Sequence, residues 1–171
     1  YNAGIQARGT GGTTIIRHNT ISNIFEGTES RGIDIRRDTQ NVTIYNNTIT
    51  NTRRGIDFQE RTNNITIKET TISGATEYGV RFSHNVSEVY FYNMSISGDT
   101  DDIRFGESDT GNITFVNTTF DRSDITWEGP DNNLTVKWYV RINVTDVAGS
   151  GINAATVTST DALSGIENTT S

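Results

Sequence analysis

Apolar and polar residues alternate along the chain in short runs, and these runs recur at a regular spacing. Four aligned copies are NVTIYNNTIT at 41–50, NITIKETTIS at 64–73, EVYFYNMSIS at 88–97 and NITFVNTTFD at 112–121, and an earlier copy starts near Thr14. Ile44, Ile67, Phe91 and Phe115 follow one another at intervals of 23, 24 and 24 residues. Self-similarity at a fixed period indicates a repeat architecture.

Each repeat has a second half with the same alternation. It begins at residues 32, 55, 79, 102 and 124 and reads GIDI, GIDF, GVRF, DIRF and DITW. Period-two alternation places every second side chain on one face of a strand. One unit of about 23 residues therefore holds three short strands, which leaves no room for a helix. In the second unit the inward positions are Val42, Ile44, Ile49, Ile56 and Phe58.

One repeat alone buries too little apolar surface to fold. Five buried side chains contribute about 10 kcal/mol, at about 1.5–3 kcal/mol each. Ordering about 23 residues costs about 1–2 kcal/mol apiece in backbone entropy. Stacked coils share hydrogen bonds and cover one another's inner faces. The pattern therefore predicts an all-β solenoid of about five stacked coils.

The repeat resembles the unit of the pectate-lyase-like superfamily, in the version N-x-T-I-x-N-N-T-I followed by G-I-x-I that is common in secreted bacterial and archaeal proteins. The resemblance covers about residues 13–136. It implies a right-handed parallel β-helix with three short strands per 23–24-residue coil. It does not fix an activity, because this scaffold hosts lyases, hydrolases, phage tailspikes, adhesins and surface proteins.

The pattern differs on both sides of the repeats. Residues 1–12 are Gly-rich and are expected to be a lead-in. Beyond residue 136, Val140, Ile142 and Val144 alternate, AGSG at 148–151 is a turn, and 155–161 is a second strand. Residues 137–171 resemble the opening hairpin of an Ig-like or carboxypeptidase-regulatory-like domain. Such a sandwich needs about seven strands, so we expect an incomplete one, finished by further chain or by a partner.

Composition and charge narrow the possible partners. The chain has no cysteine, which excludes disulfides and thiolate metal sites, and no apolar run of membrane-spanning length. The net charge of −7 argues against nucleic acid as a partner. Residues 1–62 carry eight arginines against six acids, whereas residues 63–171 carry six basic residues against fifteen acids. This asymmetry favours head-to-tail self-association.

Ten Asn-x-Ser/Thr sequons occur, more than twice the number that chance gives. Two interpretations stay open. The repeat itself contains Asn-x-Thr, so some of these asparagines are expected to form hydrogen-bonded ladders at turns. Others are expected to accept N-glycans, which would place the chain outside the cell. The acceptor candidates are Asn85, Asn93, Asn133, Asn143 and Asn168.

The motifs on the repeats bear on whether the chain is an enzyme. Neither the Gly-His-Gly nor the Arg-x-Lys motif of polygalacturonase-type sites is present, and His18 and His84 share no acid column. Asp34 and Asp57 occupy one column, which Arg81 and Arg104 continue. That column fits either a lyase-like groove or a salt-bridged ladder on the outer face of a sheet, and the ladder is favoured. We therefore expect no catalytic residues and no organic cofactor.

Carboxylates also gather on equivalent turns of neighbouring coils. Adjacent coils are about 4.8 Å apart, and Ca²⁺ takes six to eight oxygen ligands from such turns. The alternative is a solvated acidic patch. The candidate ligands are Asp99, Asp101, Asp102, Asp121 and Asp124, with Glu77 beside them.

Together these features favour a structural extracellular protein rather than an enzyme. We expect a glycosylated, archaeal subunit of a cell-surface layer, sheath or filament. Its partners would be further copies or other surface subunits, joined through β-helix ends and Ig-like segments. The alternative is a polysaccharide lyase or hydrolase, or a carbohydrate-binding module, with the longer loop at residues 23–31 walling a groove.

Overall fold

The structure is a computed structural model. It describes residues 2–9, 11–25, 27, 29–106, 110–152, 157–160 and 166–170, the last two as backbone only. Within these ranges all regular structure is β-strand, and no helix is long and apolar enough to cross a membrane. The chain divides into two compact units, Tyr1–Tyr139 and Val140–Ser171.

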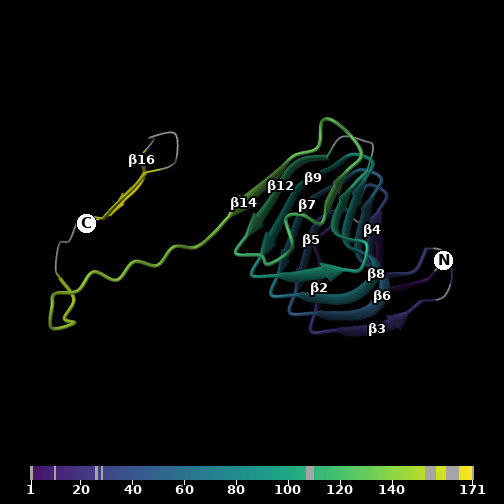
Figure 1. Ribbon diagram of the computed structural model, residues 1–171. Coiled ribbons are helices and arrows are strands. Elements are labelled where there is room, and N and C mark those ends of the chain that lie inside the picture. The colour runs from purple at the N-terminus through teal and green to yellow at the C-terminus, as the bar shows by residue number, and fades with distance from the viewer. Residues whose placement is uncertain are drawn as a thin grey trace. The chain divides into compact units, whose positions relative to one another are not determined.

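The first unit is a parallel β-solenoid whose coils stack one on another (Figure 1). We call its first face sheet A, and all strand pairs along it are parallel. In spatial order, sheet A consists of β1 (Ala3–Arg8), β4 (Arg31–Arg36), β6 (Thr48–Gln59), β8 (Thr71–Ser83), β11 (Asp101–Phe105) and β13 (Ile125–Trp127).

The second face, sheet B, is also parallel throughout. Its strands are β2 (Thr14–Arg17), β5 (Gln40–Tyr45), β7 (Thr62–Lys68), β9 (Val86–Tyr92), β12 (Thr110–Val116) and β14 (Leu134–Lys137). The third face comprises β3 (Thr20–Ile24), the first halves of β6 and β8, and β10 (Ser95–Gly98). Three faces per coil confirm the three short strands predicted for each repeat.

The residue columns predicted from the repeat are in register. Ile44 pairs with Ile67, Ile67 with Phe91, and Phe91 with Phe115. All four side chains are completely buried. Apolar side chains of the same column therefore pack on one another along the axis, and each coil covers the inner faces of its neighbours. The all-β solenoid of about five coils is confirmed.

A second inner column, on sheet A, is aromatic. Phe58 stacks on Phe82 with ring centroids 5.2 Å apart, Phe82 on Phe105 at 5.0 Å, and Phe105 on Trp127 at 4.3 Å. Phe91 of sheet B meets both Phe58 and Phe82 edge-on, so the two sheets interlock at the centre. Trp127 ends the stack and remains 46% exposed.

Glycine forms the corner between the third face and sheet A, where β6 and β8 continue without a break. A Cβ atom on Gly55 would lie 2.4 Å from the carbonyl oxygen of Gly79 and 2.4 Å from Cγ2 of Ile72. In the next coil the chain breaks between β10 and β11, and Asp102 takes the corner position. Its carboxylate accepts the backbone N–H of Gly98 at 2.9 Å and that of Asp121 at 2.6 Å.

The structure differs from the sequence-based boundary at the N-terminus. Residues 3–8, expected to be a lead-in, form β1 and pair in parallel with β4. Ile5 lies beside Ile33 and Ala7 beside Ile35, so β1 continues both inner columns of sheet A. Because glycine is common in this stretch, its short alternation of inward and outward residues was not recognised as a strand.

The second unit differs from the predicted hairpin. Residues 138–144 belong to no strand. A turn does follow, with the N–H of Gly149 donating to the carbonyl of Asp146 at 3.0 Å and one antiparallel bridge between Thr145 and Gly151. However, β15 (Val157–Thr160) pairs with β16 (Ile166–Thr170) and not with residues 138–146. Residues 155, 156 and 161 of the predicted strand lie outside the described residues.

The Thr62 hydroxyl is buried without a hydrogen-bond partner, which gives a first prediction. Thr62 pairs in register with Val86, whose apolar side chain occupies the same position one coil later. Thr62→Val is expected to raise the free energy of unfolding by about 1 kcal/mol, because it removes an unsatisfied polar group without changing the side-chain volume. Denaturant unfolding measures this change.

The matched control is Thr39→Val, one coil earlier. The Thr39 hydroxyl donates to the carbonyl of Arg36 at 2.5 Å, so its removal is expected to cost about 1 kcal/mol. Equal losses in the two variants would contradict this account of Thr62.

Candidate functional site on sheet A

The charged column predicted for the outer face of sheet A is in register. Asp34 pairs with Asp57, Asp57 with Arg81, and Arg81 with Arg104. These side chains alternate with the inward-facing residues of the same strands, as on any pleated sheet. Arg81 approaches Asp57 to 3.8 Å, and the favoured interpretation of the column as a salt-bridged ladder agrees with this geometry.

The two carboxylates of this column are fully buried although they lie on an outer face. Arginine side chains cover them. Arg31 Nε lies 2.5 Å and Arg54 Nη1 3.2 Å from Asp57 Oδ2, and Arg36 Nε lies 2.8 Å from Asp34 Oδ2. We call this group the sheet A charge cluster, and it consists of Glu29, Arg31, Asp34, Arg36, Arg54, Asp57, Glu77 and Arg81.

The loop after β3, expected to wall a groove, contributes to this cluster. The Ser30 hydroxyl donates to the carbonyl of Gly27 at 3.0 Å. Glu29 then bonds to the Arg31 guanidinium and lies 3.5 Å from Arg54. Burial raises the pKa of Glu29, but Arg31 and Arg54 lower it more, and the net pKa falls below 4.5. Glu29 thus joins this loop to two arginines of the cluster.

Glu77 binds the other side of Arg54. Its Oε2 accepts from Arg54 Nε at 2.7 Å and from Arg53 Nε at 3.1 Å. Tyr78 follows, with its ring 5.5 Å from the Arg54 guanidinium and 4.9 Å from that of Arg104. Each arginine therefore has an anionic or aromatic partner in the protein, which offsets the cost of removing its charge from water.

These contacts make part of the stability depend on pH. Burial raises the pKa of Glu77, but its bonds to Arg54 and Arg53 lower the pKa below 4.5 overall. A depressed pKa in the folded state gives stability above the unfolded value that is lost as pH falls below about 4.5. Glu77→Gln is therefore expected to lower Tm near pH 7 and to flatten the decline of Tm between pH 5 and pH 3.

Asp124 provides a control of opposite sign for this prediction. Slight burial and the nearby carboxylates of Asp102, Asp101 and Asp121 raise its pKa. Ionised Asp124 is therefore less stable in the folded protein than in the unfolded chain. Asp124→Asn is expected to raise Tm at pH 7, and a fall for both variants would contradict the assignment.

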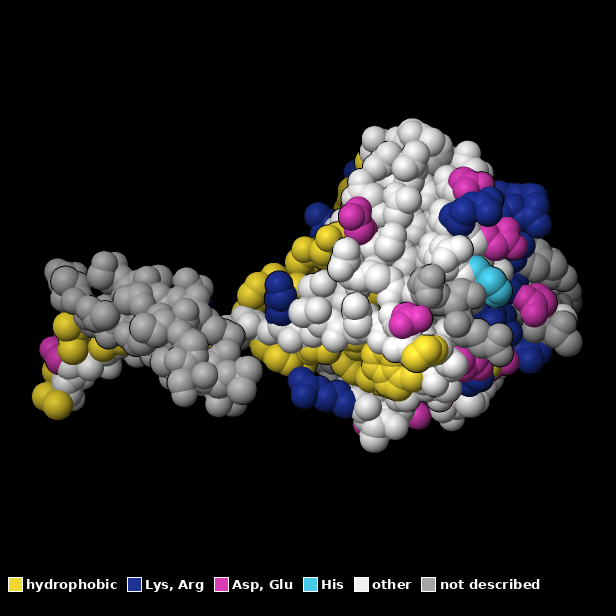
Figure 2. All heavy atoms as spheres, turned by 90° about the horizontal axis from the view of Figure 1, so that it is seen from above, with side chains coloured by type: hydrophobic (Ala, Val, Ile, Leu, Met, Phe, Trp, Pro, Cys, Tyr) yellow, Lys and Arg dark blue, Asp and Glu magenta, His cyan; other side chains and the backbone are white. Residues whose placement is uncertain are grey.

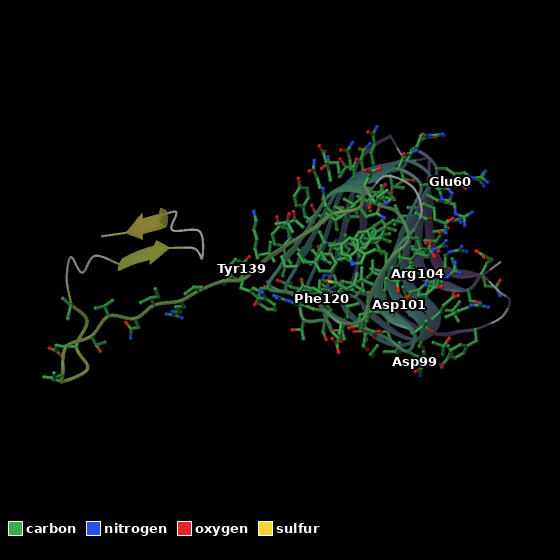
Figure 3. The ribbon with its side chains drawn as sticks, turned by 45° about the horizontal axis from the view of Figure 1, so that its top comes forward. Glu60, Asp99, Asp101, Arg104, Phe120 and Tyr139 are labelled. Atoms are coloured by element: carbon green, nitrogen blue, oxygen red, sulfur yellow. The ribbon has the colours of Figure 1, made fainter. Side chains whose placement is uncertain are left out.

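The candidate calcium ligands are engaged with donors of the protein. Asp101 accepts from Arg104 at 3.0 Å and from the Thr126 hydroxyl at 2.7 Å, and it lies beside Arg104 on sheet A (Figure 3). Asp102 accepts two backbone N–H groups at the corner described above. Among the described residues, no three His, Asp or Glu side chains are placed to hold a metal ion.

The remaining candidates lie on the same turns but have separate roles. Asp121 accepts from the backbone and hydroxyl of Ser123 at 2.8 and 2.6 Å. The backbone N–H of Asp99 donates to the carbonyl of Ala75 at 2.7 Å, which joins neighbouring coils. Asp101 and Asp102 lie in β11, not on a turn as expected. The sequence did not predict these hydrogen bonds, because spacing along the chain does not show which donors approach a carboxylate.

The sequon asparagines divide into two groups. Four in the repeat columns pair across coils as ladders, in which Asn64 Nδ2 donates to Asn41 Oδ1 at 2.5 Å and Asn117 Nδ2 to Asn93 Oδ1 at 2.9 Å. The predicted turn ladder is confirmed for these residues. Outside the ladders, Asn85 is exposed on a turn with φ 60°. Asn133 and Asn143 are exposed as well, and Asn168 lies in β16, where only the backbone is described.

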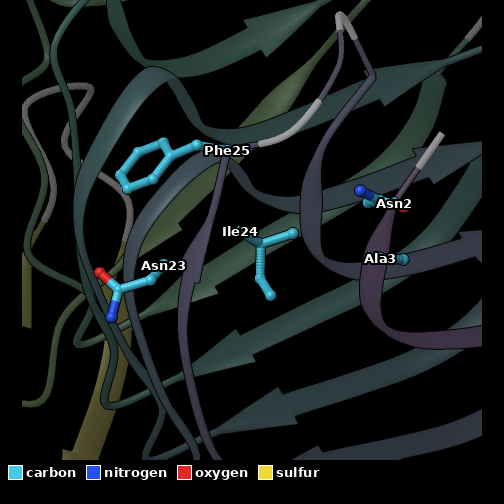
Figure 4. A pocket seen from close by; sticks show the side chains of 5 residues that line it. All are labelled: Asn2, Ala3, Asn23, Ile24 and Phe25. Atoms are coloured by element: carbon cyan, nitrogen blue, oxygen red, sulfur yellow. The ribbon is translucent and has the colours of Figure 1, made fainter.

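His18 and one surface hollow are further candidates for chemistry. His18 contacts Asn46 Nδ2 through Nδ1 at 3.0 Å and stacks edge-on against Tyr45. A hollow near the first coil is lined by Asn2, Ala3, Asn23, Ile24 and Phe25 (Figure 4). None of these five lining residues carries an acid or a base.

The sheet A charge cluster contains residues that sequence reasoning missed. Arg31 and Arg54 were counted only among the basic residues of the first coils, not as partners of the buried carboxylates that they surround. A signal was present, because the tetrapeptide Arg-Gly-Ile-Asp occurs at both 31–34 and 54–57. The repeated arginine indicates a paired charge at a fixed place in the coil.

Stacked parallel coils, in-register columns and turn ladders define the protein as a parallel β-helix. The chain belongs to the family described as "Right handed beta helix region", which matches residues 3–162. This match confirms the right-handed fold expected from the sequence and includes β1. No curated protein and no solved structure matches the chain.

Proposed function

We propose that the chain is a structural subunit of an extracellular cell-surface layer, sheath or filament. The observation that carries the proposal is the burial of Asp34 and Asp57, the only stacked acid pair on sheet A among the described residues. Their carboxylates lie beneath Arg31, Arg36 and Arg54, where a polymeric substrate has no access. Arginines therefore engage both carboxylates of this pair, which suits a structural role.

Surface charge and the sequons support the same role. Basic and acidic side chains are interspersed over the right-hand part of the solenoid surface (Figure 2). The exposed sequons at Asn85, Asn133 and Asn143 fit N-glycosylation and hence an extracellular, archaeal type of surface protein. In the second unit, Val140 and Ile142 are 80% and 56% exposed, which fits a segment that contacts other subunits.

The test combines imaging with an activity assay. Negative-stain electron microscopy and light scattering of the concentrated chain are expected to show ordered polymers. Assays on uronic-acid polymers such as polygalacturonate and alginate are expected to show no turnover. Measurable turnover would overturn the structural role in favour of a polysaccharide lyase or hydrolase, and absence of any assembly across salt and concentration would also contradict it.

A further inference from the structure

The third face presents two rows of hydroxyl side chains to solvent. In β3, β6, β8 and β10 these side chains flank buried isoleucines of the core, namely Ile21, Ile49, Ile72 and Ile96. Period-two alternation therefore directs the hydroxyls outward. We call this surface the hydroxyl face. Its first row is Thr20, Thr48, Thr71, Ser95 and Thr119, and its second row is Ser22, Thr50, Ser73 and Ser97.

The hydroxyl face repeats in two directions. The first row is in register through five coils, because each member pairs with its equivalent in the next coil. The second row is in register from Ser22 through Thr50 to Ser73. Neighbouring strands lie about 4.8 Å apart, and two residues along a parallel strand span about 6.6 Å. The hydroxyls therefore form a two-dimensional array with these two repeats.

The hydroxyls of this face are available to an external group. Among the described residues, none of the nine hydroxyls bonds to another group of the protein. By contrast, the neighbouring Thr70 and Thr118 hydroxyls donate to backbone carbonyls at 3.1 and 3.3 Å. The nine positions carry no charge and no aromatic ring, so they suit neither an ionic ligand nor a stacked sugar. An ordered array of neutral donors and acceptors suits water.

Ice contains oxygen atoms in a similar arrangement. Each oxygen has four hydrogen-bonded neighbours in tetrahedral directions, at O···O distances of about 2.75 Å. That geometry places next-nearest oxygens about 4.5 Å apart and gives a perpendicular repeat of about 7.3 Å. The hydroxyl array differs from this lattice by about 0.3 Å per coil and by about 0.7 Å between the two rows. Over five coils the first difference grows to about 1.2 Å, less than half of one hydrogen-bond length.

We propose that the hydroxyl face binds the surface of an ice crystal. This activity goes beyond the structural role above and does not depend on it. Its cost in conformational entropy is small, because threonine side chains are stiff at χ1 and the strands beneath them are held by the buried isoleucine column. Each hydroxyl takes the place of one lattice water, donating and accepting hydrogen bonds as water does.

The wild-type chain tests the activity directly. Nanolitre osmometry measures the gap between the melting and freezing temperatures of an ice crystal, and slow growth of an ice hemisphere measures how much protein the ice retains. We expect a gap that widens with protein concentration, and retention above that of an unrelated protein of similar size. A gap and a retention no greater than those of the unrelated protein would overturn the proposal.

The variants Thr71→Tyr and Thr66→Tyr test whether the hydroxyl face is the binding surface. Thr71 lies in the middle of the first row, where a tyrosine ring would hold the ice surface away from the neighbouring hydroxyls. Retention is expected to fall by about tenfold, which corresponds to about 1.4 kcal/mol of binding free energy. Thr66 is in the same coil but on the outer face of sheet B, where it pairs with Tyr90. Thr66→Tyr is therefore expected to fold and to keep full retention.

Ser95→Tyr repeats the test one coil later in the first row, at an exposed position. It is expected to lower retention as Thr71→Tyr does, and it decides the test if Thr71→Tyr does not fold. Thermal unfolding of each variant checks the fold. Equal retention by Thr66→Tyr and by the folded variants of the hydroxyl face would overturn the assignment of ice binding to this surface.

Discussion

Replacing Asp57 with alanine is expected to lower the free energy of unfolding by about 3–5 kcal/mol. The substitution leaves Arg31 and Arg54 almost fully buried without their shared carboxylate. Their charges then lose the attraction that offset their removal from water. Urea denaturation of the two proteins at pH 7 measures the loss.

Two variants separate this effect from general damage to the fold. Asp38→Ala removes a carboxylate that bonds Arg61 at 2.6 Å, but both of these side chains are more than 60% exposed. A loss of about 0–1 kcal/mol is expected there. The pair replacement Arg31→Met/Asp57→Leu is expected to destabilise less than Asp57→Ala alone. A loss below 1 kcal/mol for Asp57→Ala would show that solvent reaches the cluster.

Replacing Phe82 with alanine is also expected to cost about 3–5 kcal/mol. Its ring lies between those of Phe58 and Phe105 and contacts Phe91 edge-on, with no exposed surface. The cavity lies in a middle coil, where coils on both sides hold the backbone in place and limit collapse. The measurement is again denaturant unfolding, supported by hydrogen exchange of β8.

The end of the same aromatic column supplies the control for Phe82. Trp127→Ala removes a larger ring, but that ring is 46% exposed and has a stacking partner on one side only. Its loss is expected to cost the isolated chain less than the loss of Phe82. If Trp127→Ala were the more damaging variant at low concentration, stability would depend on the end coil rather than on central packing.

The repeat made most of the fold predictable. Residues 23 or 24 apart with alternating neighbours specify strands, inward positions and register together, because any shift would move Ile44 and its equivalents out of the core. The inner columns and the order of charges on sheet A follow directly from the spacing. Alternation assigns each side chain to a face, however, and does not show what covers the outer face.

Burial of the charged column was not predictable for that reason. Asp34 and Asp57 were assigned to the outside, and they are outside the sheet. The side chains that enclose them come from Arg31 at the start of β4, from Arg54 in the middle of β6 and from Glu29 in a loop that follows no repeat. Their reach depends on rotamers and loop path, which one-dimensional periodicity does not contain.

In the second unit, by contrast, a regular alternation of side chains predicted a strand that does not form. Val140, Ile142 and Val144 have a regular alternation, yet residues 138–144 form no strand, and β15 pairs with β16. Alternation shows that a segment suits a sheet, but pairing requires a partner strand. Inside the solenoid the preceding coil always supplies one. Beyond β14 no preceding coil offers a strand edge to residues 138–144 in the described structure, so alternation alone does not predict a strand there.

The parallel ladder also determines how much chain the solenoid stores along its axis. One coil of 23 or 24 residues advances the axis by a single strand spacing, about 4.8 Å. The same residues fully extended would span about 80 Å. Along the axis the folded coil is therefore about one-seventeenth as long as the extended chain, and hydrogen bonds that run parallel to the axis hold it in this form. Tension along that axis acts on all inter-coil ladders in series, and each coil that detaches lengthens the molecule by about 75 Å.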